Sequence, residues 1–85
     1  MEQSQTKLNE IRAELTAHLN KPILLFQIEN RKMIPNLMII TAITTAGATA
    51  EQNCYDNKGN VRNVIRHTVD VIKIMTGYQK IVYLD

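Results

Sequence analysis

The stretch from Val61 to Thr76, VRNVIRHTVDVIKIMT, decides the fold. Nine of its sixteen residues are β-branched, which favours a strand because branching at Cβ restricts χ1 and suits a pleated surface. Its apolar residues nevertheless recur at helical spacing and gather on one side of a helical wheel. They are Val61, Val64, Ile65, Thr68, Val69, Val71, Ile72 and Met75. In an extended chain both faces would mix apolar with charged residues. The periodicity therefore predicts a helix over residues 61–76.

The residues at both ends of this stretch are compatible with a helix. Asn60 is a good amino-terminal cap, and Gly77 stands where a left-handed carboxyl-terminal cap is needed. The preceding segment, Asp56 to Asn60 (DNKGN), is a strong turn sequence, and it is also typical of a hairpin between two strands. A strand over the same residues is therefore the alternative interpretation.

A second helix is predicted near the amino terminus, over Ser4 to Leu19. Its apolar residues are spaced by three or four positions and form one stripe. They are Leu8, Ile11, Leu15 and Leu19. Asn20 can close the carboxyl end of this helix, and Pro22 prevents its continuation.

Alternating side chains predict strands in the middle of the chain and at its end. Ile23 to Glu29 (ILLFQIE) has one wholly apolar face, and Asn36 to Thr45 begins apolar on both faces. Tyr78 to Leu84 has the composition of a last strand, and Glu51 to Tyr55 is a candidate for a short additional one. Between them, Ala46 to Ala50 consists of small residues, which predicts a turn or a close approach of another backbone.

Together these elements predict an α+β fold in a single domain, residues 1–85. We expect a small, mostly antiparallel sheet of three or four strands, with an amino-terminal helix and a second helix before the last strand, in the order α-β-β-(β)-α-β. A chain of 85 residues with 45% hydrophobic and 21% charged residues has room for one core. Its net charge of +2 permits contact with nucleic acid without requiring it. The single Cys54 fits a reducing cytoplasm, and no apolar run is long enough to span a membrane.

The sequence offers little material for catalysis, so we expect no enzyme, no cofactor and no metal site. Ser4 is the only serine, and Cys54 lies in no recognisable nucleophile motif. The two histidines and the single cysteine have no metal-ligand spacing. A weak anion site is conceivable at Lys58, Gly59 and Asn60, because backbone N–H groups at a helix start attract anions. A capped surface turn is the simpler interpretation of these three residues.

Two surfaces are candidates for contact with a partner. The polar side of the helix predicted over 61–76, extended by a basic turn, would suit DNA or RNA; its residues are Arg62, Asn63, Arg66, His67 and Lys73, with Arg31 and Lys32 in the turn. Strand surface that two helices cannot cover would suit a second copy of the chain or another protein. For that contact we expect Ile23, Leu25, Met33, Met38, Val82 and Leu84, if the helices cover the opposite face.

The sequence thus predicts a small, non-enzymatic, cytoplasmic protein-interaction module that self-associates. Small inhibitors or adaptors of mobile genetic elements are of this size and type. The alternative is a nucleic-acid-binding protein that uses the helix over 61–76.

Overall fold

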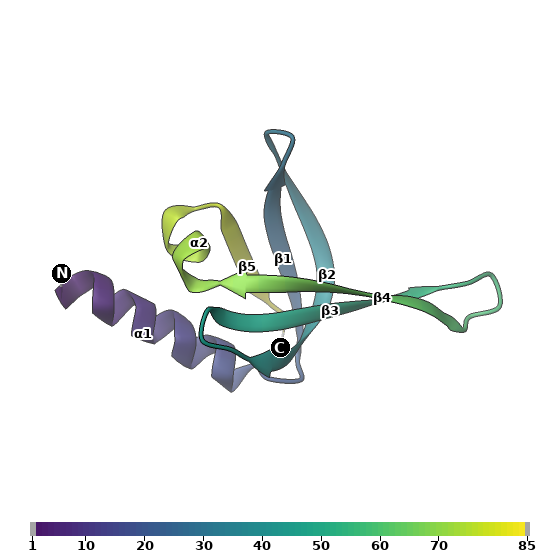
Figure 1. Cartoon of the computed structure of the whole chain (residues 1–85), viewed down its shortest axis with the longest axis horizontal. Coiled ribbons are helices and arrows are strands. Elements are labelled where there is room, and N and C mark those ends of the chain that lie inside the picture. Colours follow the sequence, from purple (N-terminus) through teal and green to yellow (C-terminus); the bar gives the residue numbers. More distant parts are fainter. Residues whose placement is uncertain (1, 85) are drawn as a thin grey trace.

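The chain folds into one antiparallel sheet of five strands with two helices, as seen in the computed structural model, which describes residues 2–84 (Figure 1). The elements are α1 (Glu2–Ala17), β1 (Pro22–Glu29), β2 (Lys32–Ile43), β3 (Gly47–Tyr55), β4 (Val61–Asp70), α2 (Val71–Thr76) and β5 (Gln79–Tyr83). The strand order in the sheet is β4-β3-β2-β1-β5. The α+β class, the amino-terminal helix and a helix before the last strand are confirmed. The predicted three or four strands undercount the sheet.

The missing strand is β4, because the predicted helix over 61–76 is wrong for residues 61–70. These residues pair antiparallel with β3 across a hairpin, and only Val71–Thr76 is helical. The helical spacing was misleading, since Val61 and Val64 are exposed in the strand instead of lining a core. The β-branched composition and the DNKGN turn indicated the correct structure. Asp70 caps the short helix, and its carboxylate accepts a hydrogen bond from the N–H of Ile72 at 2.8 Å.

The sheet is made of two hairpins that run in different directions (Figure 1). The β1–β2 hairpin turns at Asn30 and Arg31, both with positive φ, as a two-residue type I′ turn requires. Strand β2 links the β1–β2 hairpin to the β3–β4 hairpin: Lys32 to Ile39 pair with β1, and Ile39 to Ile43 pair with β3. The β2–β3 ladder contains a bulge between Ile40 and Ala42. The β2–β3 pairing reaches no further than Glu51 along β3. Residues 52–65, here called the arm, therefore pair only with each other.

Both helices pack on the same face of the sheet, which becomes the inner face. The buried core consists of Leu15 from α1, Val71 from α2 and inward-facing strand residues. These strand residues are Ile23, Leu25, Met38, Ile40, Ala48, Ala50 and Val69. At the end of α1 the ring of His18 stacks on that of Tyr83, with centroids 4.0 Å apart. The helices thus leave the opposite, outer face of the sheet without cover from this chain.

In the small-residue segment from Ala46 to Ala50, the backbone at Gly47 lies close to the backbone of Val69 in β4, as the composition predicts. A Cβ on Gly47 would lie 2.3 Å from the carbonyl oxygen of Val69, so only glycine fits there. Ala48 and Ala50 are fully buried beyond it. The segment forms the first half of β3, and that strand is consequently longer than the predicted Glu51–Tyr55.

The side chain of Gln79 connects the two edge strands of the sheet. Its Oε1 accepts a hydrogen bond from the N–H of Asp70 at 2.9 Å, and its Nε2 donates to the carbonyl of Thr68 at 3.0 Å. The same Nε2 donates to Oε1 of Gln27 at 3.1 Å, and Nε2 of Gln27 lies 3.0 Å from Nδ1 of His67. The Gln79 amide therefore provides hydrogen-bond partners for the Asp70 N–H and the Thr68 carbonyl, which a neighbouring strand would otherwise provide.

Candidate functional site

The outer face of the sheet carries a continuous set of apolar side chains. Residues paired across an antiparallel ladder lie on the same face, so the register identifies the set. Leu24 pairs with Leu37 on one side and with Val82 on the other. We call the following residues the outer face: Pro22, Leu24, Phe26 and Ile28 of β1, Met33, Pro35, Leu37 and Ile39 of β2, and Val82 of β5.

The outer face is large for a chain of this size. Leu37 is 56% exposed, and Ile28 and Ile39 are exposed to a similar extent. A contiguous apolar patch that stays exposed is typical of a surface that contacts another protein.

A groove of about 390 Å³ lies where the outer face meets the arm. Its lining combines apolar residues of β2 with polar and aromatic residues of the arm. It is formed by Pro22, Leu37, Met38, Ile39, Thr41, Glu51, Gln52, Asn53 and Tyr55. The carboxylate of Glu51 in this lining accepts hydrogen bonds from Thr41 at 3.1 Å and from Arg66 at 3.2 Å. Because the one acidic group is paired, the groove is suited to an apolar or aromatic side chain.

The structure divides the six residues predicted for self-association. Ile23, Leu25 and Met38 are fully buried in the core, so they cannot contact a partner, and that part of the prediction is wrong. The reason is that both rows of β1 begin with apolar residues, and the helices cover the row that holds Ile23 and Leu25. Met33, Val82 and Leu84 are exposed. Sequence reasoning missed Leu37 and Ile39 as surface residues, although the wholly apolar row of β1 opposite them was visible.

The predicted basic helix face does not exist, because its residues are spread over a strand and a helix. Arg66 is on the outer face of β4 beside Glu51, whereas the alternation of the strand places Asn63 and His67 on the inner face. Arg62 lies at an irregularity between β3 and β4, and Lys73 lies on α2.

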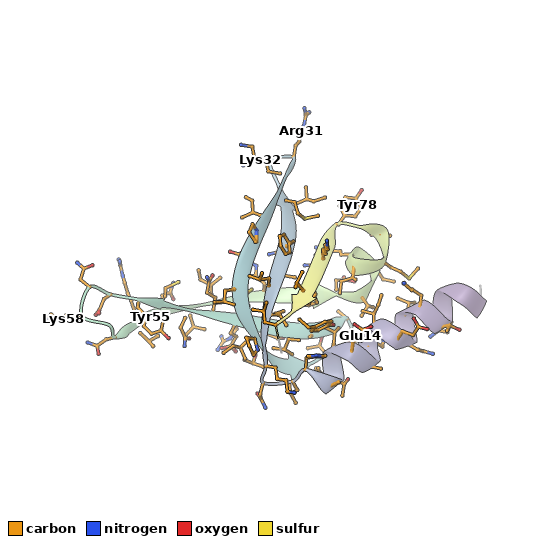
Figure 2. All side chains as sticks on the ribbon, turned by 180° about the vertical axis from the view of Figure 1, so that it is seen from behind. Glu14, Arg31, Lys32, Tyr55, Lys58 and Tyr78 are labelled. Atoms are coloured by element: carbon orange, nitrogen blue, oxygen red, sulfur yellow. The ribbon has the colours of Figure 1, made fainter. Side chains whose placement is uncertain are left out.

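The two cations predicted to extend this surface, Arg31 and Lys32, are at the tip of the β1–β2 hairpin (Figure 2). Lys58, from the predicted anion site, is at the end of the arm. The fold thus separates these positive charges and does not gather them into one patch.

The turn with the predicted anion site lies between two strands and not at a helix start. The Asp56 carboxylate accepts hydrogen bonds from the N–H groups of Lys58 at 2.8 Å and Asn60 at 3.0 Å. Gly59 supplies the positive φ that the turn needs. The amides that would hold an anion are therefore already bonded within the turn, which corrects the prediction.

The remaining chemistry-bearing groups are scattered. Cys54 is half-buried on the arm. Within residues 2–84, no three His, Cys, Asp or Glu side chains are arranged to hold a metal ion. In that same part of the chain, no helix has the length and apolarity to cross a membrane. Burial raises the pKa of the Tyr83 phenol from 10.0 to about 12, with a further contribution from the negative charge of Glu14.

No protein-family model matches this sequence, and no curated protein has significant similarity to it.

Proposed function

We propose that this chain is a small, non-enzymatic protein-interaction module that self-associates through its outer face. The observation that carries the proposal is the continuous apolar surface over β1, β2 and β5, which neither helix covers. Burying such a surface contributes about 25 cal/mol per Å² removed from water.

A second copy of the chain is the occupant that this surface fits best. The outer face is apolar across its width, and Lys80, paired with Phe26, is the charged residue that the ladder of β1 and β5 places on it. A face with so little charge matches another copy of itself, and two sheets packed face to face form an apolar layer about 10 Å thick. A two-fold axis satisfies this contact because the same patch serves both copies.

Sedimentation over a concentration series tests the proposal. We expect the native chain to form a dimer and Leu37→Glu to be monomeric, because a carboxylate would be buried without a partner at the centre of the contact. Ile72→Glu is the matched control, since Ile72 is 52% exposed but lies on α2, away from the outer face. It should dimerise like the native chain. A native chain that stays monomeric at the highest concentration, or an equal effect of both variants, would refute the proposal.

The nucleic-acid alternative loses the feature on which it was based. It required a helix over 61–76 with a row of cations, and residues 61–70 are a strand. Arg66, the central cation of that row, is paired with Glu51. No cluster of basic side chains on the outer face or the arm replaces it among the described residues, so the self-associating module is the function that we put forward.

A further inference from the structure

We propose that a pocket between β1, α2 and the start of β5 binds a small organic carboxylate. The pocket has a volume of about 470 Å³ and is lined by Gln27, Ile28, Lys73, Tyr78 and Gln79. Pockets of about 300 to 1,000 Å³ are the usual sites of small-molecule binding. This site goes beyond the proposed function, because self-association is not needed to form it.

Lys73 supplies a positive charge to the lining of the pocket. It is exposed on α2 and forms no ion pair with a carboxylate of the described residues. None of the described side chains in the lining is acidic. The groove at the arm differs in this respect, because its lining includes the carboxylate of Glu51. An ammonium group without a counter-charge attracts an anion, and its contact with a carboxylate is a charge-assisted hydrogen bond.

Gln27 contributes an amide donor that the fold leaves available. Its Oε1 accepts a hydrogen bond from Gln79, and its Nε2 faces Nδ1 of His67. An amide nitrogen carries two hydrogens, so the second hydrogen has no acceptor among the described residues. The hydroxyl of Tyr78 can donate as well. A carboxylate, which has two oxygens and only accepts hydrogen bonds, is the group that matches an ammonium, an amide N–H and a hydroxyl.

Hydrogen bonds within the chain hold these donors in place before a ligand arrives. The N–H of Tyr78 donates to the carbonyl of Lys73 at 2.9 Å, which keeps the backbones of these two residues together. Gln79 is 2% exposed and positions Gln27 through the bond of 3.1 Å between their amides. Groups that are already ordered lose little conformational freedom on binding, which favours affinity.

The apolar part of the lining determines what the carboxylate is attached to. Ile28 is 46% exposed and Tyr78 is 61% exposed, so an aliphatic side chain and an aromatic ring border the same pocket as the donors. Figure 2 shows Tyr78 at the turn that precedes β5. A ring or a branched alkyl group next to the carboxylate would cover both side chains. The ligand is therefore an aromatic or branched acid, either free or as the C-terminal residue of a peptide.

Titration of the native chain with phenylacetate, followed by NMR of the side-chain amides, tests the site. We expect the Gln27 signals to shift with a dissociation constant of about 1 mM, which is ordinary for so small a ligand. Phenylacetamide has the same shape without the charge, and it should bind about tenfold more weakly or less. The amide of Gln5 on α1 is an internal reference that should not move.

Two lysine variants identify the charge that is responsible. Lys73→Met keeps the length of the side chain and should weaken phenylacetate binding by about tenfold or more, because a charged hydrogen bond is lost. Lys80→Met is the matched control: Lys80 is also exposed, but it pairs with Phe26 on the outer face and is not in the lining. Its removal should change binding by less than about twofold, since a distant surface charge is screened. Circular dichroism of each variant verifies the fold.

A short peptide that ends in phenylalanine distinguishes the two sources of the carboxylate. Tighter binding of this peptide than of phenylacetate would assign the site to chain ends, and weaker binding would assign it to free acids. Amidation of the peptide terminus should abolish its binding, because the charged group is then absent.

The titration is repeated on Leu37→Glu, because Ile28 also belongs to the outer face. Binding to the native chain or to this variant supports the site. The site is refuted if the Gln27 signals stay unchanged in both at ten times the expected dissociation constant. It is also refuted if phenylacetamide binds as well as phenylacetate, or if the two lysine variants lose binding equally. Sedimentation of the native chain decides the proposed function separately from these results.

Discussion

The buried side chain of Gln79 donates a hydrogen bond to the side-chain carbonyl of Gln27 across 3.1 Å, and this contact connects the last strand to the first. Through its other bonds to Thr68 and Asp70, Gln79 also holds the end of β4. Two strands at opposite ends of the sheet order are thus joined by one amide group.

Replacing Gln79 should therefore destabilise the fold more than its size suggests. We expect Gln79→Leu to lower the free energy of unfolding by about 1 to 3 kcal/mol, because the Asp70 N–H and the Thr68 carbonyl lose their partner in a partly buried place. Urea unfolding measures this change. The control is Gln5→Leu on the exposed surface of α1, where Gln5 bonds to Asn9 and the expected change is within about 0.5 kcal/mol. Equal stability of the two variants would contradict this role of Gln79.

The polarity of the same network fixes the tautomer of His67. The Asp70 N–H can only donate, so the Gln79 atom that faces it is the acceptor Oε1. Gln79 therefore donates through Nε2 to Oε1 of Gln27. This leaves Nε2 of Gln27, a donor, facing Nδ1 of His67. Neutral His67 must accept at Nδ1 and carry its hydrogen on Nε2. His18 should have the opposite tautomer, because its Nδ1 lies 2.7 Å from the carbonyl oxygen of Glu14.

Nitrogen NMR of the imidazoles at a pH where both rings are neutral tests this pair of assignments. Since the chain has two histidines, one spectrum gives both results. The expected pattern is one ring of each tautomer. The same tautomer for both rings would show that the hydrogen bonds from Gln79 through Gln27 to His67 run in another direction. Gln27→Leu should remove the tautomer preference of His67 and leave that of His18 unchanged.

Gly47 should tolerate no larger residue. We expect Gly47→Ala to lower the free energy of unfolding by about 3 kcal/mol, because its Cβ would collide with the backbone of Val69 at a φ of +154°. Gly59→Ala is the matched control: its φ is +83° but nothing lies within 4 Å of the new Cβ, so only conformational strain of about 1 kcal/mol applies. Thermal unfolding of the two variants compares them. Equal losses would mean that the contact with Val69 is unimportant.

Stability should fall in strong alkali because of Tyr83. Its pKa is raised from 10.0 to about 12, chiefly by burial, so the folded state holds a proton that the unfolded state releases. The contribution of this group is fully present below pH 10 and is lost as the pH rises through about 12. In a titration followed by phenolate absorbance, Tyr83→Phe should remove the highest transition. If that transition persists in the variant, the assignment to Tyr83 is incorrect.

Sequence reasoning predicted the parts of the fold where local pattern and tertiary packing agree. The stripe that includes Leu15 makes α1 amphipathic, and the alternation in Ile23–Glu29 makes β1 a strand. At Val61–Asp70 the periodicity and the β-branched composition disagreed. Pairing with β3, which is a tertiary interaction, decides that conflict, and the spacing of apolar residues in one segment contains no information about it.

The site was less predictable because it depends on which face of the sheet the helices cover. The row of Leu24 in β1 is wholly apolar, whereas the row of Ile23 also contains Gln27 and Glu29. Local pattern alone therefore did not indicate that packing places Ile23 inside and Leu24 outside. Gln27 shares the row of Ile23 and Leu25, and this polar residue beside two buried apolar ones was a local sign of a buried hydrogen bond. The groove beside Tyr55 depends on the angle between the arm and the body of the sheet, which no local pattern encodes.

Intermolecular nuclear Overhauser effects between two differently labelled copies of the chain test the outer-face contact most directly. In a mixed sample we expect contacts between copies from the methyl groups of Leu24, Leu37 and Ile39. The methyl groups of Ile72 on α2 should show none. Intermolecular contacts confined to the helices, or none at concentrations where the chain is dimeric, would contradict self-association through the outer face.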